Sequence, residues 1–200
     1  MCRLIFQTGR PLTETDLIHS LQKGEEPAFR NLVLLYQHRV YNTVLGFLQE
    51  PADAEDMTQE VFIRIFQKIG TFKGEAALAT WIYRIAVTTA LDALRKARRQ
   101  KRGGFLAAFR GRDEPTEPPD FFHPGVAAEQ KEDSVLLFKA IRRLPENQQA
   151  AFLLQKLEGL SQPEIATVLK TTVSAVESLL VRAKAGLRNQ LKDIHSMNQR

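Results

Sequence analysis

The stretch 159–191, GLSQPEIATVLKTTVSAVESLLVRAKAGLRNQL, constrains the possible folds of this chain more than any other segment. Ser161 and Glu164 have the spacing of a capping box, and the apolar residues after them fit one side of a helix that ends near Lys170. After a short turn, Ser174 is placed to cap a second helix. Two short helices around a tight turn are typical of a helix-turn-helix, whose second helix enters the major groove of DNA. A helical hairpin with solvated charges is the alternative.

The second helix of this motif separates into an apolar and a polar side. Its apolar stripe consists of Val176, Leu179, Leu180, Ala183 and Leu187. The residues that we expect to face DNA are Ser174, Ala175, Glu177, Ser178, Arg182 and Lys184. Ser174 and Glu177 again have capping-box spacing, so Glu177 has two interpretations. It either caps the helix or accepts a hydrogen bond from the amino group of a cytosine.

Composition bounds the class of protein. The 200 residues are 44% hydrophobic and 26% charged with a formal net charge of +5, which suits a soluble protein that meets an anion. Cys2 is the sole cysteine, which excludes an internal disulfide and a cysteine-built zinc site and fits a reducing cytoplasm. The start MCRLIF is too short for the core of a signal peptide, and no apolar run approaches the length of a membrane span. We therefore expect a soluble, cytoplasmic protein.

Glycine and proline gather in one segment, 103–125, and this composition resists regular structure. Helical periodicity dominates on both sides of it, so the sequence predicts an all-α fold of two small helical domains joined by a flexible linker. The expected parts are an N-terminal extension 1–12, a helical domain 13–100, the linker 101–129, a helix-turn-helix domain 130–192 and a tail 193–200.

The third expected helix of the N-terminal domain has two distinct faces. Helices over 13–23 and 27–49 precede it, and it begins at Pro51 and ends at Gly70. Its apolar stripe is Met57, Val61, Phe62, Ile65, Phe66 and Ile69. The opposite face begins with Asp53, Glu55, Asp56, Gln59 and Glu60. The helix dipole alone explains acidic residues at this end, but five such polar groups also form a docking edge for a basic protein surface.

A basic face runs along the next expected helix, 80–99, which follows a loop over 71–79. At about 100 degrees per residue, Arg84, Thr88, Arg95, Arg98 and Arg99 fall within an arc of about 100 degrees, with Trp81 at its edge. Such a face beside an aromatic residue suits contacts to phosphates and to a stacked base. A lone tryptophan is equally at home in a core.

Two stretches carry a resemblance to a known family. These are DAEDMTQEVFIRIFQKIGTFKGEAALATWIYRIAVTTALDALRKARR (53–99) and LPENQQAAFLLQKLEGLSQPEIATVLKTTVSAVESLLVRAKAGL (144–187). Together they resemble the extracytoplasmic-function sigma factors, which are promoter-specificity subunits of bacterial RNA polymerase. The resemblance covers most of the chain, and both motifs occur in the order and spacing of the family.

The resemblance implies a role for each surface. Docking on core RNA polymerase falls to Asp53, Asp56, Gln59 and Glu60. Recognition and melting of the minus-ten promoter element, with capture of a flipped base of the single strand, falls to Phe72, Lys73, Gly74, Trp81, Arg84 and Thr88. The basic face adds Arg95, Arg98 and Arg99 as contacts to the DNA backbone. The helix-turn-helix reads the double-stranded minus-thirty-five element, while 136–157 contacts the polymerase flap. The linker passes near the RNA exit path, where the acidic residues of 113–133 imitate nucleic acid. The family also implies an anti-sigma protein as partner, which can hold the chain near the membrane.

This sequence departs from the family pattern at the two DNA-reading positions. Thr88 stands where many members have an asparagine, so the base chosen at the flipped position is open. Glu177 and Leu179 stand where basic residues are common, so phosphate attraction is weaker there.

Two other classes of function remain as alternatives. An autonomous helix-turn-helix regulator would bind duplex DNA without polymerase, but it has no need of the acidic and basic helices. An enzyme is disfavoured because the four histidines are scattered and no phosphate-binding glycine loop or nucleophile motif occurs. We expect no cofactor, no metal and no small-molecule substrate.

Overall fold

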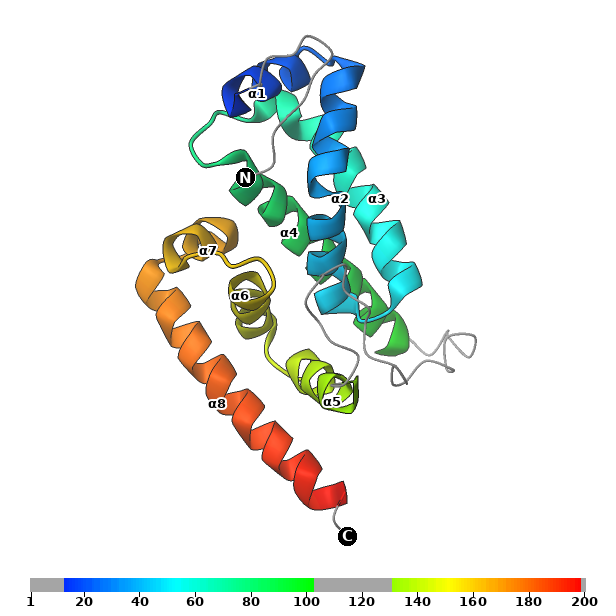
Figure 1. Ribbon diagram of the computed structural model, residues 1–200. Coiled ribbons are helices and arrows are strands. Elements are labelled where there is room, and N and C mark those ends of the chain that lie inside the picture. Colours follow the sequence, from blue (N-terminus) through cyan, green and yellow to red (C-terminus); the bar gives the residue numbers. More distant parts are fainter. Residues whose placement is uncertain (1–12, 103–130, 199–200) are drawn as a thin grey trace.

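The computed structural model describes residues 13–102 and 131–198, and within these ranges every regular element is a helix (Figure 1). The N-terminal half contains α1 (Glu14–Gln22), α2 (Glu26–Leu48), α3 (Pro51–Lys68), the short 3-10 helix η1 (Ile69–Thr71) and α4 (Leu78–Arg102). The C-terminal half contains α5 (Lys131–Arg142), α6 (Glu146–Lys156), α7 (Gln162–Leu169) and α8 (Val173–Asn198). The all-α expectation is confirmed. The expected N-terminal extension and nearly all of the expected linker lie outside the described residues.

Local sequence signals set the helix starts in the N-terminal half. Thr13 and Asp16 form a capping box at the start of α1, and Pro51 occupies the first turn of α3, where its missing N–H is not needed. The apolar stripe of α3 packs into a core with α1, α2 and α4, as expected, except at one residue. Phe66 is 57% exposed, because its ring lies at the margin of the stripe and touches Phe29 of α2 only edge-on, with 5.2 Å between ring centroids.

The helix-turn-helix is formed by α7 and the first part of α8. The Ser161–Glu164 capping box is present and α7 ends at Leu169, as the sequence predicted. The structure adds that Lys170, just after it, is in the left-handed conformation. The expected cap at Ser174 is wrong. α8 begins at Val173, and the hydroxyl of Thr172 accepts the hydrogen bond from the N–H of Ala175, 3.2 Å away. Ser174 therefore lies inside the first turn.

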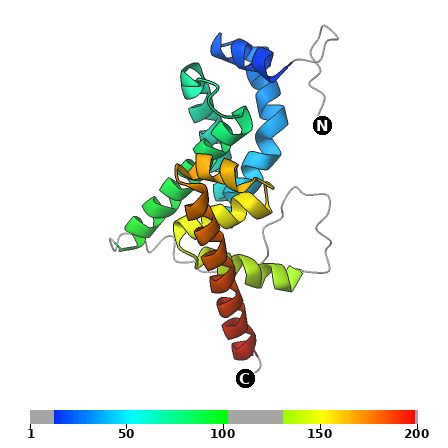
Figure 2. The same ribbon diagram turned by 90° about the vertical axis from the view of Figure 1, so that its left-hand side faces the viewer.

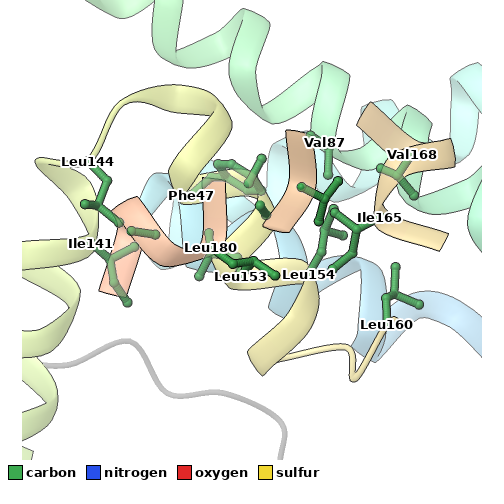
Figure 3. Close-up of a cluster of buried hydrophobic side chains, with 14 of the residues drawn as sticks. Phe47, Val87, Ile141, Leu144, Leu153, Leu154, Leu160, Ile165, Val168 and Leu180 are labelled. Carbon is green, nitrogen blue, oxygen red and sulfur yellow. The ribbon is translucent and has the colours of Figure 1, made fainter. Parts of the chain in front are cut away.

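The two halves share a hydrophobic core. Figure 3 shows Phe47 of α2 and Val87 of α4 among leucine and isoleucine side chains of the C-terminal half, and Tyr83 and Leu91 belong to the same cluster. Gly46 allows α6 to come close to α2, because a Cβ at this position would lie 2.9 Å from the Cδ1 of Leu157. In Figure 2, α6 and α7 lie against the middle of the N-terminal helices. The halves are therefore packed together rather than held apart.

None of the helices in the described ranges combines the length and the apolar character that a membrane crossing needs. Within the same residues, no group of histidine, cysteine and acidic side chains is arranged to hold a metal ion.

Candidate nucleic-acid interface

The first turns of α3 present the acidic edge that the sequence indicated. Asp53, Asp56 and Gln59 are exposed, whereas Glu60 is half-buried because Arg64 pairs with it at 2.7 Å. Ile63 lies on the same side of the helix, one turn after Gln59, and is 51% exposed. The sequence analysis did not name Ile63. An isoleucine outside the apolar stripe of this helix was the feature that could have pointed to it. The edge thus combines carboxylates with an exposed apolar side chain.

The loop before α4 buries its aromatic residue, Phe72, and exposes Lys73 and Gly74. Phe72 is buried and packs against Trp81, with 5.3 Å between the two ring centroids. Lys73 and Gly74 are exposed, and Gly74 has a φ of 74°, a conformation that favours glycine. Phe72, which the sequence assigned to DNA contact, therefore supports the loop from within.

α1 holds this loop in place, which sequence reasoning missed. The side-chain amide of Gln22 donates to the carbonyl of Phe72 at 2.8 Å. The carboxylate of Glu14 accepts from the backbone N–H of Leu78 at 3.0 Å, at the first residue of α4. These bonds join residues far apart in the chain, so no local sequence pattern predicts them. Together they fix both ends of the segment between η1 and α4.

The basic face of α4 is divided between solvent and the C-terminal half. Thr88 and Arg99 are exposed. Arg84 donates to the carbonyl of Thr167 in α7 at 2.9 Å. Arg95 and Arg98 both pair with Glu146 at the start of α6, at 2.9 Å and 3.1 Å. Three of the five residues on this face are thus bonded to the other half of the molecule.

Glu158, just after α6, is the centre of a second set of contacts between the halves. Its side chain is 3% exposed and accepts from the hydroxyl of Tyr83 at 2.6 Å and from that of Thr43 at 2.8 Å. Arg39 lies 3.4 Å from the same carboxylate, and its guanidinium stacks over the ring of Tyr83. Burial, together with the Glu158 charge, raises the pKa of Tyr83 far above its usual range, so Tyr83 stays a hydrogen-bond donor.

The outer face of α8 is open to solvent. Its members Ser174, Glu177, Ser178, Arg182 and Lys184 are exposed, and Ala175 is half-buried. The structure removes the capping interpretation of Glu177: with Thr172 as the cap, the third position of the helix is Ala175.

An apolar side chain also lies on this face. Val181 is 67% exposed and, at about 100 degrees per residue, projects between Glu177 and Ser178. Sequence reasoning passed over Val181 because it looked only for polar groups on the outer side.

The described residues thus contain three separate surfaces: the acidic edge of α3, the basic face of α4 with its preceding loop, and the outer face of α8. The acidic edge and the α8 face are exposed, whereas the α4 face is partly covered by α6 and α7.

Comparison with known proteins gives matches in both halves of the chain. Residues 32–100 match the model of sigma-70 region 2, and residues 134–187 match that of sigma-70 region 4. The RNA polymerase sigma-H factor of Pseudomonas aeruginosa is 31% identical over 191 residues, covering 90% of this chain and 95% of the relative. The ECF RNA polymerase sigma-E factor of Escherichia coli K12 is 32% identical over 192 residues, with 92% and 96% covered.

Two solved structures share the fold. CnrH, solved in complex with the cytosolic domain of CnrY, matches with a TM-score of 0.65 at 22% identity, covering 88% of this chain and 96% of that one. The sigma factor RpoE of Bartonella quintana, solved with the anti-sigma factor NepR, matches with a TM-score of 0.64 at 20% identity, with 82% and 96% covered.

Proposed function

Because this chain belongs to the extracytoplasmic-function (ECF) family of sigma factors, we propose that its three surfaces divide the work of promoter recognition among them. As a sigma factor it binds RNA polymerase, recognises the minus-ten and minus-thirty-five promoter elements and catalyses no reaction itself. The observation that supports the division is that one chain carries an exposed acidic helix edge and two separate surfaces of the kind that meets DNA.

The acidic edge of α3 is the surface for core polymerase. Asp53, Asp56, Gln59 and Glu60 attract a basic partner surface, and Ile63 beside them adds an apolar contact. Arg64 holds Glu60 in place by their ion pair, so this carboxylate has a defined position before the partner arrives.

The loop and α4 bind the minus-ten element. Lys73, Arg84, Arg95, Arg98 and Arg99 contact phosphates, while Gly74 lets the DNA backbone come close and Thr88 faces the flipped base. Trp81 and Phe72 build the wall of the base pocket, because each ring packs on the other. Unstacking a base costs a few kcal/mol, which stacking and phosphate contacts offset without any hydrolysis.

The outer face of α8 reads the minus-thirty-five element. Arg182 is placed for a guanine edge or a phosphate, and Ser174, Ala175, Ser178 and Lys184 line the groove beside it. Glu177 accepts from a cytosine amino group, and Val181 adds an apolar contact suited to a thymine methyl group.

The parts of the chain follow the same division. Residues 13–100 act as the region 2 domain, 130–192 as the region 4 domain, and 101–129 as the connection between them. We place the protein in the cytoplasm, where the polymerase is. An anti-sigma protein is a further partner, by analogy with the CnrY and NepR complexes of two proteins that share the fold.

The docking assignment is tested by reversing two charges on the acidic edge. Asp56→Lys combined with Glu60→Lys should weaken binding of the labelled chain to core polymerase at least tenfold in a titration. The matched control is Glu25→Lys with Glu26→Lys, which also reverses two carboxylates and also breaks an (i, i+4) pair, that of Glu26 with Arg30 at 2.9 Å. Unaltered affinity in a folded acidic-edge variant would remove the docking assignment.

The α4 assignment is tested through the salt dependence of promoter opening. Replacing Lys73 and Arg99 by alanine should weaken open-complex formation on every promoter and make it less dependent on salt, because fewer counterions are released. A loss confined to one promoter sequence with an unaltered salt slope contradicts a phosphate role. Binding of the chain to its duplex promoter as tightly without core polymerase as with it would favour the autonomous regulator instead.

A further inference from the structure

We propose that Glu177 and Val181 of α8 read one base together, and that the base they fit is a 5-methylcytosine in the minus-thirty-five element. This inference rests on the proposed role of α8. It adds a chemical class of ligand, a pyrimidine that presents both an amino group and a methyl group in the major groove, which neither side chain alone would select.

Both side chains are accessible to DNA. Val181 is 67% exposed, the highest value among the large apolar side chains of the described residues. Glu177 is exposed as well, and its carboxylate makes no hydrogen bond or ion pair within that part of the chain. α8 runs along one margin of the molecule (Figure 1), and the exposure of the two side chains places them on its outer side.

The two side chains are neighbours on the helix surface. They are four residues apart, which separates them by about 6 Å along the axis and by about 40 degrees around it. A helical side chain leans toward the N-terminal end of its helix, so the methyl groups of Val181 lean toward the turn that carries Glu177. The valine is short and stiff, whereas the longer glutamate can bend beside it. A carboxylate and an apolar surface are therefore presented side by side.

The residues around Val181 let the helix come close to the bases. Ser174 and Ala185 lie nearly in line with Val181, two turns before it and one turn after it, and Ser178 lies beside it. All three of these side chains are short and exposed. Short side chains let the helix axis approach the floor of the major groove, so a residue as small as valine can touch a base there.

The major-groove edge of 5-methylcytosine matches this pair group by group. Its amino group donates to a carboxylate, and the methyl group on the neighbouring ring atom is apolar, as a valine side chain is. Cytosine lacks the methyl group. Thymine has the methyl group but presents an oxygen acceptor in place of the amino group, and an acceptor repels the carboxylate of Glu177. Adenine has an amino group, but beside it in the groove is the acceptor N7, which valine cannot satisfy.

Four pyrimidines placed in turn at each pyrimidine position of the element separate the two contacts. Cytosine and 5-methylcytosine differ only in the methyl group, as do uracil and thymine. The measurement is the concentration of holoenzyme, formed with the full chain, that gives half-maximal run-off transcription. At one position, 5-methylcytosine should lower this concentration about fourfold relative to cytosine, the effect of burying one methyl-sized group. At the same position, cytosine should be preferred to uracil at least fivefold, because only cytosine offers the amino group.

Two variants assign each effect to its side chain. Val181→Ala should abolish the methyl effect and keep the preference for the amino group. Glu177→Ala should abolish the preference for the amino group and keep the methyl effect, so that thymine serves as well as 5-methylcytosine. The matched controls are Leu34→Ala and Glu25→Ala, which remove an exposed apolar side chain and an exposed carboxylate from α2 and its N-cap. Both controls should rank the four bases as the unaltered chain does.

Two results overturn the inference. One is a methyl effect that is absent at every position or that survives Val181→Ala. The other is a methyl effect and an amino preference at different positions, which would mean that Val181 and Glu177 read separate bases. A scrambled minus-thirty-five element distinguishes these failures from a failure of the proposed function. If scrambling weakens transcription while either result holds, only the one-base contact is overturned, whereas transcription that is insensitive to scrambling overturns the role of α8 and this inference with it.

Discussion

A single residue decides how the recognition helix is interpreted. The sequence placed the cap of α8 at Ser174, whereas in the structure the hydroxyl of Thr172, two positions earlier, accepts from the N–H of Ala175. The choice moves Glu177 from a capping position to an exposed position with no capping role. Its carboxylate is therefore available to DNA.

The first prediction separates base reading from backbone contact on α8. Arg182→Ala should relax the preference at one or two positions of the minus-thirty-five element, because a bidentate guanine contact contributes about 1–3 kcal/mol of discrimination. Glu177→Ala should change the preference at one cytosine and leave the melting temperature unaltered, since Glu177 caps nothing. The measurement is run-off transcription on promoters with every single base change in that element.

Lys192→Ala is the matched control for this scan. It removes an exposed cation from the same side of α8, about 15 Å further along the axis from Arg182. If Arg182→Ala lowers transcription equally from all promoter variants, Arg182 contacts a phosphate and reads no base. A lowered melting temperature with unaltered preference for Glu177→Ala would contradict the base contact at that position.

At the scale of elements, α1 both packs into the N-terminal core through Leu17 and Leu21 and clamps the loop before α4. Gln22 and Glu14 each bond to the backbone of the segment that joins η1 to α4, at Phe72 and Leu78. A loop fixed in this way is ordered before DNA arrives, which reduces the conformational entropy lost on binding.

The second prediction follows from this clamp. Gln22→Ala removes the neutral hydrogen bond to the carbonyl of Phe72, worth about 0.5–1.5 kcal/mol, together with a longer one to the carbonyl of Ile69, and should lower open-complex formation about twofold to tenfold. Affinity for core polymerase should not change, since Gln22 is far from the acidic edge in the sequence and belongs to another helix. Gln67→Ala, an exposed glutamine on α3, is the control. An equal loss in both variants would speak against the clamp.

The third prediction concerns the capping box of α7 and has a pH dependence. The hydroxyl and the N–H of Ser161 both donate to Glu164 and hold the pKa of this carboxyl below its usual 4.5. A lowered pKa means that the contribution to stability is fully present above pH 4.5 and is lost as the pH falls through the pKa of the folded state.

Glu164→Ala should therefore lower the melting temperature by about 1–4 °C at pH 7, the effect of a typical cap in a chain of this size. The difference from the unaltered chain should narrow in acid. Glu177→Ala, which removes an exposed carboxylate without a capping bond, should show no such difference at any pH. Thermal melts followed by circular dichroism across this pH range provide the measurement.

The periodicity of apolar residues predicted most of the helices, because the pattern of an amphipathic helix is visible within its own segment of the sequence. The starts at Pro51 and Ser161 and the end at Lys170 all depend on residues within one turn of the boundary. The prediction that Phe66 is buried was wrong, because the edge of an apolar stripe depends on how far a neighbouring helix extends over it. The sequence of α3 carries no information on that extent.

At the scale of the whole molecule, the sequence indicated the surfaces but not the way the halves pack. The partners of Glu158 at Thr43 and Tyr83 lie 115 and 75 positions away in the chain. Arg95 and Arg98 look like a solvated basic face in the sequence. In the structure both side chains stay about half exposed, but each has an ion-pair partner in Glu146 of the other half. Contacts across such separations depend on the fold of both halves, so no local pattern reveals them.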